Sequence, residues 1–134
     1  MNDKVLRHKA ICDELNKLYE RKNHDYGDSF HQTFVEEGFA MPRIRLADKF
    51  NRFKTLSKQT NLARMLAKKA TDKTAYEVIL ESQKVTDESI RDTLIDLANY
   101  AVMTILEMDD DAAKASQNAA QDSAVANPEK EALS

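Results

Sequence analysis

Apolar residues recur at helical spacing from the beginning of the chain. Between residues 3 and 22, Val5, Cys12, Leu15 and Tyr19 repeat at intervals of seven, three and four. These intervals return to one face of an α-helix, so the pattern predicts a first helix over residues 3–22. Cys12 lies on this apolar face, and we expect it to be a small core residue.

The middle of the chain continues the helical pattern with one interruption. A second helix is predicted over residues 43–58, with Leu46, Phe50 and Phe53 on its buried side. Residues 59–84 predict two shorter helices around a break at residues 71–72. The cationic residues along this stretch are expected to form a solvated face.

The remaining segments decide the expected fold class. Residues 23–42 lose the helical period, which predicts a long aromatic-rich loop that either has a function or contains a short helix near 29–37. A last helix is predicted over 87–108. Residues 109–134 have almost no large apolar side chains, so we expect a disordered or weakly helical tail. The prediction is an all-α, compact bundle of about four to six helices, forming a single domain over residues 1–108.

Composition supports this fold class and excludes several kinds of protein. The chain has 134 residues with 2 glycines and 2 prolines, and strands usually recruit more of both for their turns. Its net charge of −3, with mixed signs, gives no reason to expect direct nucleic-acid binding. One cysteine excludes an intramolecular disulfide and a cysteine-based zinc site. No membrane-spanning run or signal sequence is apparent, so we expect a cytoplasmic protein without a membrane partner.

The last predicted helix carries an acidic stripe. Glu88, Asp92, Asp96 and Asn99 fall within an arc of roughly 80° on one side of the helix. Like charges at this spacing repel, which predicts that something positive faces them. Oxygen ligands on a fixed scaffold suit Mg²⁺ or Mn²⁺ bound together with substrate phosphate. A plain solvent-facing side of the helix is the alternative.

The second predicted helix offers cations that could face this stripe. Arg45, Asp48, Lys49 and Arg52 are three and four residues apart and share one face. They could form intrahelical salt bridges of little energetic value. Alternatively, Lys49 and the arginines could neutralise the acidic stripe or hold phosphate oxygens beside a metal ion.

The segment around residues 22–29 is a third candidate feature. Asp25 could cap a helix or act as a ligand, and Gly27 permits a turn with positive φ. Tyr26 is equally compatible with anchoring the core and with stacking on a nucleotide base.

Three motifs together resemble a known family. They comprise Lys22, Asp25, Tyr26, Gly27 and Ser29, then Arg45, Leu46, Asp48, Lys49 and Arg52, and finally Glu88, Ser89, Asp92, Thr93, Asp96, Leu97 and Tyr100. The chain resembles, over residues 15–107, the first of the nucleotide modification associated domains, a family common in phage genomes and bacteria.

The last helix is also similar to that of the all-α nucleoside triphosphate pyrophosphatases of the MazG and dimeric dUTPase type. Those enzymes bind Mg²⁺ with carboxylates from two helices and assemble as dimers or tetramers. Asp92 and Asp96 fit their second acidic motif approximately. Where the first motif would stand, this chain has Arg45, Asp48 and Lys49.

These resemblances imply a Mg²⁺- or Mn²⁺-dependent nucleotide-binding protein, acting as a nucleoside triphosphate pyrophosphohydrolase in phage nucleotide metabolism or DNA modification. They also imply a homodimer or higher homo-oligomer, located in the bacterial host cytoplasm if the gene is phage-encoded. The alternatives are a non-catalytic protein that sequesters or senses a nucleotide, and a structural helical interaction module. The expected roles are metal binding by Glu88, Asp92 and Asp96, catalysis by Lys49, Arg52 and Asp48, and nucleotide binding by Asp25, Tyr26, Arg45, Asn99 and Tyr100.

Overall fold

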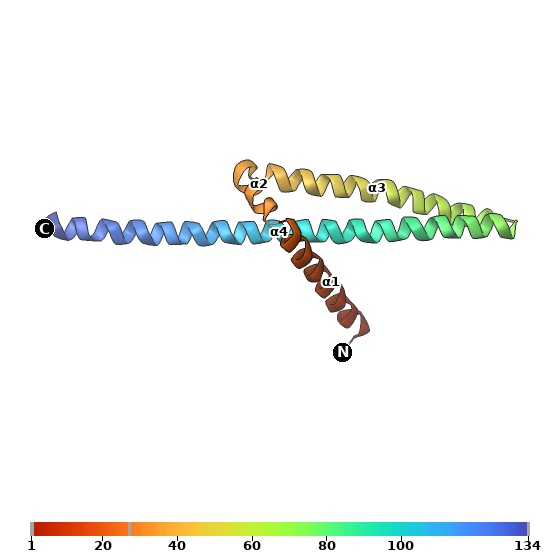
Figure 1. Ribbon diagram of the computed structural model, residues 1–134, viewed down its shortest axis with the longest axis horizontal. Coiled ribbons are helices and arrows are strands. Elements are labelled where there is room, and N and C mark those ends of the chain that lie inside the picture. Colours follow the sequence, from red (N-terminus) through yellow and green to blue (C-terminus); the bar gives the residue numbers. More distant parts are fainter. Residues whose placement is uncertain (1, 27, 134) are drawn as a thin grey trace. The chain divides into compact units, whose positions relative to one another are not determined.

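The computed structural model describes residues 2–26 and 28–133, and the side chains of residues 2–24 and 28–124. This part of the chain forms four helices and no strand (Figure 1). The helices are α1 (Asp3–Tyr26), α2 (Ser29–Glu37), α3 (Ala40–Lys69) and α4 (Lys73–Leu133). The predicted all-α fold class is therefore confirmed. No helix within the described residues is long and apolar enough to cross a membrane.

The predicted long loop over residues 23–42 is wrong, whereas the short helix considered within it is confirmed. α1 continues to Tyr26, α2 covers Ser29–Glu37, and α3 already begins at Ala40. Pro42 lies in the first turn of α3, where its missing N–H removes no helical hydrogen bond. Gly38 separates α2 from α3 and has a φ of 62°, which favours glycine.

α3 and α4 form an antiparallel helical hairpin. Two contacts fix how the helices are aligned. Lys49 on α3 meets Asp96 on α4, and farther along the pair Thr60 meets Asp87. In Figure 1, α3 accordingly runs alongside the first part of α4.

The predicted break at residues 71–72 is confirmed by the short connection between Lys69 and Lys73. The helices on either side are longer than predicted, because α3 includes the first of the two expected short helices and α4 includes the second. Residues 43–69 and 73–108 contain no glycine or proline, so nothing in the sequence interrupts either helix.

The chain divides into two compact units, Met1–Ala101 and Val102–Ser134. The second unit consists of the C-terminal part of α4, whose backbone is helical through Leu133. Its side chains from Met108 to residue 124 are exposed. The predicted tail over residues 109–134 and the domain boundary at residue 108 stay predictions.

The core of the first unit is small and lies near α2 and the middle of α4. Its buried apolar residues are Phe34, Met41, Pro42 and Ile95. Aromatic contacts extend this core, since the Phe34 ring meets Phe39 edge-on at 5.4 Å between centroids.

Two core assignments made from the sequence are wrong. Cys12 is exposed. Among the described side chains, the first residue of α1 with a hydrogen bond to α4 is Glu14, farther along the helix. Phe50 is 55 % exposed, whereas Leu46 and Phe53 on the same helix are half-buried. A helix in a two-helix hairpin has only one covered side, so an apolar face wider than that side stays partly open.

Candidate functional site: a charged groove between α1 and α4

The centre of the candidate site is Asp96, which lies between two lysines from different helices. Lys49 Nζ on α3 donates to Asp96 Oδ2 at 2.9 Å, and Lys22 Nζ on α1 lies 3.5 Å from Asp96 Oδ1. Asp96 and Lys49 are largely covered, with side-chain exposures of 26 % and 27 %, while Lys22 is 55 % exposed. The positive charge that the acidic stripe requires is therefore present at Asp96.

α1 is held against α4 by a second set of contacts. The Arg91 guanidinium donates two hydrogen bonds to the Glu14 carboxylate, at 2.9 and 2.8 Å. The Asn99 side-chain amide donates to the Leu15 carbonyl oxygen at 3.3 Å. The fork-to-fork pairing of guanidinium and carboxylate fixes orientation as well as distance. Hydrogen bonding to Arg91 lowers the pKa of Glu14, and the same contact raises the pKa of Arg91.

Between these contacts lies a groove of about 600 Å³, which we call the α1–α4 groove. Its α4 wall carries two carboxylates, and its α1 wall carries charges of both signs: Asp92 and Asp96 on α4, and Lys17, Arg21 and Lys22 with Asp13 and Glu14 on α1. The cations of the α1 wall thus share the groove with carboxylates from both helices. Such a groove can bind an anionic ligand and a divalent cation side by side.

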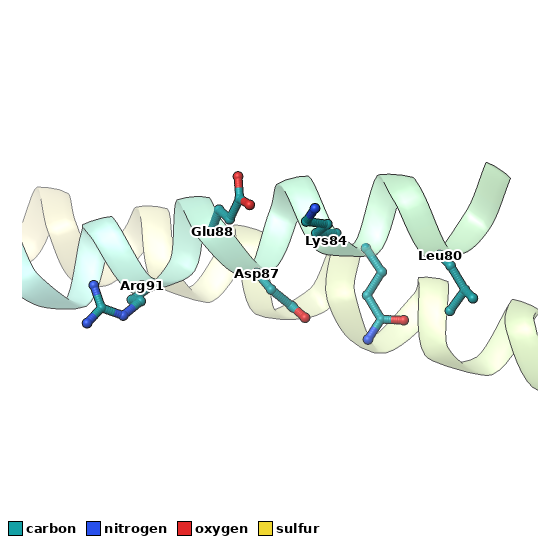
Figure 2. A pocket seen from close by; sticks show the side chains of 6 residues that line it. Leu80, Lys84, Asp87, Glu88 and Arg91 are labelled. Atoms are coloured by element: carbon teal, nitrogen blue, oxygen red, sulfur yellow. The ribbon is translucent and has the colours of Figure 1, made fainter. Parts of the chain in front are cut away.

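The structure brings two of the three predicted metal ligands into this groove. Asp92 and Asp96 line it, whereas Glu88 lines a separate hollow of about 410 Å³ on α4, together with Leu80 and Lys84. Figure 2 shows this second hollow, with the carboxylates of Asp87 and Glu88 pointing away from each other. Among the described side chains, no three histidine, cysteine, aspartate or glutamate residues lie close enough together to hold a metal ion.

The predicted catalytic residues on α3 are only partly gathered at the site. Lys49 reaches Asp96, while Arg45, Asp48 and Arg52 are exposed. No ion pair of these three residues is found within the part of the chain that the structure describes, so the intrahelical salt bridges considered from the sequence are not formed. Arg45 and Arg52 lie about one helical turn to either side of Lys49 and flank it.

The predicted nucleotide-binding residues have varied placements. Asn99 is half-buried beside the groove, with its amide nitrogen held by Leu15. The Tyr100 ring stacks on Phe30 of α2, with 6.1 Å between the ring centroids. The side chains of Asp25 and Tyr26 lie outside the described residues, and their predicted roles remain predictions.

Sequence reasoning missed the contribution of α1 to the site. Glu14, Lys17 and Arg21 recur at intervals of three and four and so share one helix face. That spacing was the available signal, but an alternation of charges on a helix is also typical of a solvated surface. Only the packing of α1 against α4 distinguishes the two cases.

Comparison with known proteins identifies a matching family model. A family model described as nucleotide modification associated domain 1 matches residues 22–108, which cover more than half of the chain. The match includes α2, α3, the groove carboxylates Asp92 and Asp96, and Lys22 at the end of the α1 wall. No curated protein and no solved structure matches the chain.

Proposed function

The chain belongs to the nucleotide modification associated domain 1 family, and from this premise we propose that it binds a nucleotide in the α1–α4 groove with Mg²⁺ or Mn²⁺. The reaction proposed for this site is the splitting of a nucleoside triphosphate into a monophosphate and pyrophosphate, in phage nucleotide metabolism or DNA modification.

The observation that carries this proposal is the position of Asp96 between Lys49 and Lys22. Without ligand, the Asp96 carboxylate pairs with both ammonium groups and offsets one of their two positive charges. A nucleotide entering with its metal ion offers each of them a new partner. The lysines would turn to the phosphate oxygens, and Asp96 would be released to the metal ion.

The donor set of the groove fits a magnesium-like ion. Asp92 and Asp96 lie one turn apart on α4 and supply oxygen ligands. Mg²⁺ is usually held by one or two carboxylates, with substrate phosphates and waters completing its shell. Glu88 would add a third carboxylate after turning from its own hollow. When bound, the ion would neutralise phosphate charge and lower the pKa of an attacking water.

The remaining residues bind and orient the substrate. Lys17 and Arg21 project into the groove from α1 and would hold the outer phosphates. Lys49 would stabilise the charge that develops on the leaving pyrophosphate, assisted by Arg52 one turn farther along α3. Asp48, next to Lys49, would assist at the metal or position the attacking water.

The base and sugar are assigned to the end of the groove nearest Asn99. The Asn99 amide nitrogen is held by Leu15, which leaves its side-chain oxygen to accept a hydrogen bond from the nucleotide. Tyr100, Arg45, Asp25 and Tyr26 are proposed to contact the base or sugar from the neighbouring helices.

A second candidate function is nucleotide sequestration or sensing without hydrolysis. This function is favoured because the face of α3 that lies against Asp96 carries the Lys49 ammonium group and no carboxylate. A metal site with ligands from only one helix holds its ion less firmly. Binding tolerates such a site better than catalysis does, because catalysis requires fixed geometry in the transition state.

The experiment measures thermal stability against a panel of nucleoside triphosphates, with and without Mg²⁺, and pyrophosphate release in the same samples. Asp92→Asn and Asp96→Asn are compared with Asp111→Asn, a matched change at an exposed position of α4. Hydrolysis predicts a metal-dependent shift and a product, both lost in the two groove variants and retained in the control. A shift without product identifies a binding protein. No shift with any nucleotide refutes both candidates and leaves the charges as structural salt bridges.

A further inference from the structure

α3 is strongly basic, although the chain as a whole is slightly acidic. Residues 40–69 contain nine lysines and arginines and a single carboxylate, Asp48, which gives α3 a formal charge of +8. The whole chain carries −3, so the remaining residues sum to −11. The expectation of no nucleic-acid partner rested on the overall charge, which does not reflect this uneven distribution.

Five of these cations lie on one face of α3, which we call the basic face. At 100° per residue they fall within an arc of about 100° around the helix axis. All five side chains are exposed, and they are Arg43, Lys54, Lys58, Lys68 and Lys69. Asp48 lies outside this arc, so the basic face carries no carboxylate.

The contact with α4 leaves the basic face open. Thr60 is buried and donates to Asp87, so it marks the side of α3 that packs on α4. The basic face begins about 80° from Thr60 and extends to about 180° from it. Among the described side chains, Lys49 is the one cation of α3 that forms an ion pair with a carboxylate, and it lies outside the basic face.

An ordinary solvated helix surface is the alternative, and α1 shows how such a surface is built. Arg7 on α1 pairs with Asp3 one turn away, at 2.9 Å. Charges of alternating sign are typical of a solvent-exposed helix. The basic face instead places like charges one turn apart, at Lys54 and Lys58, and these repel each other unless an anion lies over them. This pattern indicates an anionic partner.

The spacing of the cations indicates the kind of anion. They form three groups along the helix, namely Arg43, Lys54 with Lys58, and Lys68 with Lys69. At a rise of 1.5 Å per residue, neighbouring groups are about 19 Å apart. Each strand of a B-form duplex returns to the same side after about 34–36 Å, so one side of the duplex meets a phosphate backbone about every 17 Å on average. The three groups therefore match three successive backbones.

We infer that the basic face of α3 binds double-stranded DNA, with the duplex lying along the helix and its phosphates against the three groups of cations. Asn51 and Asn61 lie within the same arc and add hydrogen-bond donors for phosphate oxygens. Contacts to phosphates alone hold the duplex without reading its sequence. Charges more than about 8 Å away are largely screened at physiological salt, so the acidic remainder of the chain does not cancel this local attraction.

Two other anionic partners fit the basic face less well. Single-stranded nucleic acid is usually bound by several aromatic side chains that stack on its bases. Phe50 is the one aromatic residue within the arc, and it is 55 % exposed. A helix that lies on an anionic membrane presents a large apolar face to the lipid. Here Asn51 and Asn61 stand between the cations instead.

The test measures binding of a fluorescently labelled DNA duplex by anisotropy, without nucleotide or metal ion. A duplex of about 16 base pairs is roughly 54 Å long and spans the basic face. We expect a dissociation constant on the order of 10⁻⁶ M at about 50 mM salt. Its logarithm should change with the logarithm of the salt concentration with a slope of about 4.5, since each of five phosphate contacts contributes about 0.9.

Two double variants separate the basic face from general charge. Lys54→Gln with Lys58→Gln removes the middle group and should weaken binding about tenfold, while reducing the salt slope by about 1.8. The control is Lys4→Gln with Lys114→Gln, which removes the same charge from exposed positions of α1 and α4 and should leave binding nearly unchanged. Circular dichroism confirms that each variant keeps its helices.

Unlabelled competitors identify the partner. Duplex should displace the labelled probe better than a single strand of the same length, and better than vesicles that contain anionic lipid. The inference is overturned by the absence of duplex binding at low salt, by equal weakening in both double variants, or by a single strand or vesicle that competes better than duplex. Neither double variant alters a residue assigned to the α1–α4 groove, and no readout involves nucleotide. DNA binding can therefore fail or hold independently of the proposed function.

Discussion

Lys49 Nζ lies 2.9 Å from Asp96 Oδ2, and this contact joins two helices through residues 47 positions apart in the sequence. Both side chains are about three-quarters covered. A charge-assisted hydrogen bond in this setting stabilises the fold and also keeps a cation and a carboxylate ready for a ligand.

Replacing Lys49 by methionine separates these two roles. Lys49→Met keeps the apolar stem but removes the ammonium group, leaving Asp96 with only the longer Lys22 contact. We expect a loss of about 1–3 kcal/mol in the free energy of unfolding, measured by urea denaturation. If nucleotide enters the groove as proposed, the metal-dependent thermal shift should also disappear. Unchanged stability would contradict the observed pairing, and an unchanged ligand shift would contradict only its proposed role.

Thr60 supplies a second contact between α3 and α4. Its hydroxyl is buried and donates to Asp87 Oδ1 at 2.9 Å. Thr60→Val keeps the shape but leaves a half-buried carboxylate without this donor, so we expect destabilisation by about 1–2 kcal/mol. The control is Thr55→Val on the exposed side of α3, which should change the unfolding midpoint little.

Gly38 tests the junction between α2 and α3. Its φ of 62° and ψ of −147° belong to a region that side chains strongly disfavour, although a Cβ at this position would meet no atom within 4 Å. Gly38→Ala should therefore cost about 1–3 kcal/mol through backbone strain alone. Ala63→Gly within α3 is a useful comparison, since its smaller expected cost of about 1 kcal/mol comes from helix propensity. Equal stability of Gly38→Ala and wild type would contradict the assigned backbone geometry.

The attachment of α1 to α4 should depend on pH through Glu14. Hydrogen bonding to Arg91 lowers the pKa of Glu14 from its ordinary value of 4.5. A lowered pKa in the folded state stabilises the fold above the ordinary value, and this contribution is lost as the pH falls through the lowered pKa. The melting temperature of wild type should exceed that of Glu14→Gln at neutral pH, and the two should converge as the pH falls from 4.5 through the lowered pKa of Glu14. A difference that persists at low pH would have another origin.

The sequence was sufficient for the fold class because helical periodicity and the near absence of glycine and proline both favour helices. The same signals did not predict how long α3 and α4 are. The 59–69 segment was predicted as a separate short helix, yet no glycine or proline there ends α3. Cys12 was misplaced because a periodic apolar line predicts a buried face only where another helix covers it.

The candidate site was predictable to a similar degree. Repulsion along the acidic stripe correctly indicated a facing cation, and Lys49 occupies that place at Asp96. Glu88 shows the limit of the same reasoning, since three residues within an 80° arc can still border two different hollows. Spacing alone could not predict the α1 wall, because the spacing of its lysines and arginine does not indicate which helix packs against them.

The connection between α3 and α4 has a consequence for the order in which the chain folds during synthesis. Because only residues 70–72 separate the two helices, the hairpin can close as soon as this part of α4 leaves the ribosome. Its contacts join residues 27 positions apart at Thr60 and Asp87 and 47 positions apart at Lys49 and Asp96. α1 is synthesised first, but it can pack against α4 only after α4 has been synthesised. Glu14 and Arg91 are separated by 77 residues, and Leu15 and Asn99 by 84. The N-terminal helix is thus expected to dock last, and the groove is completed only when that step has occurred.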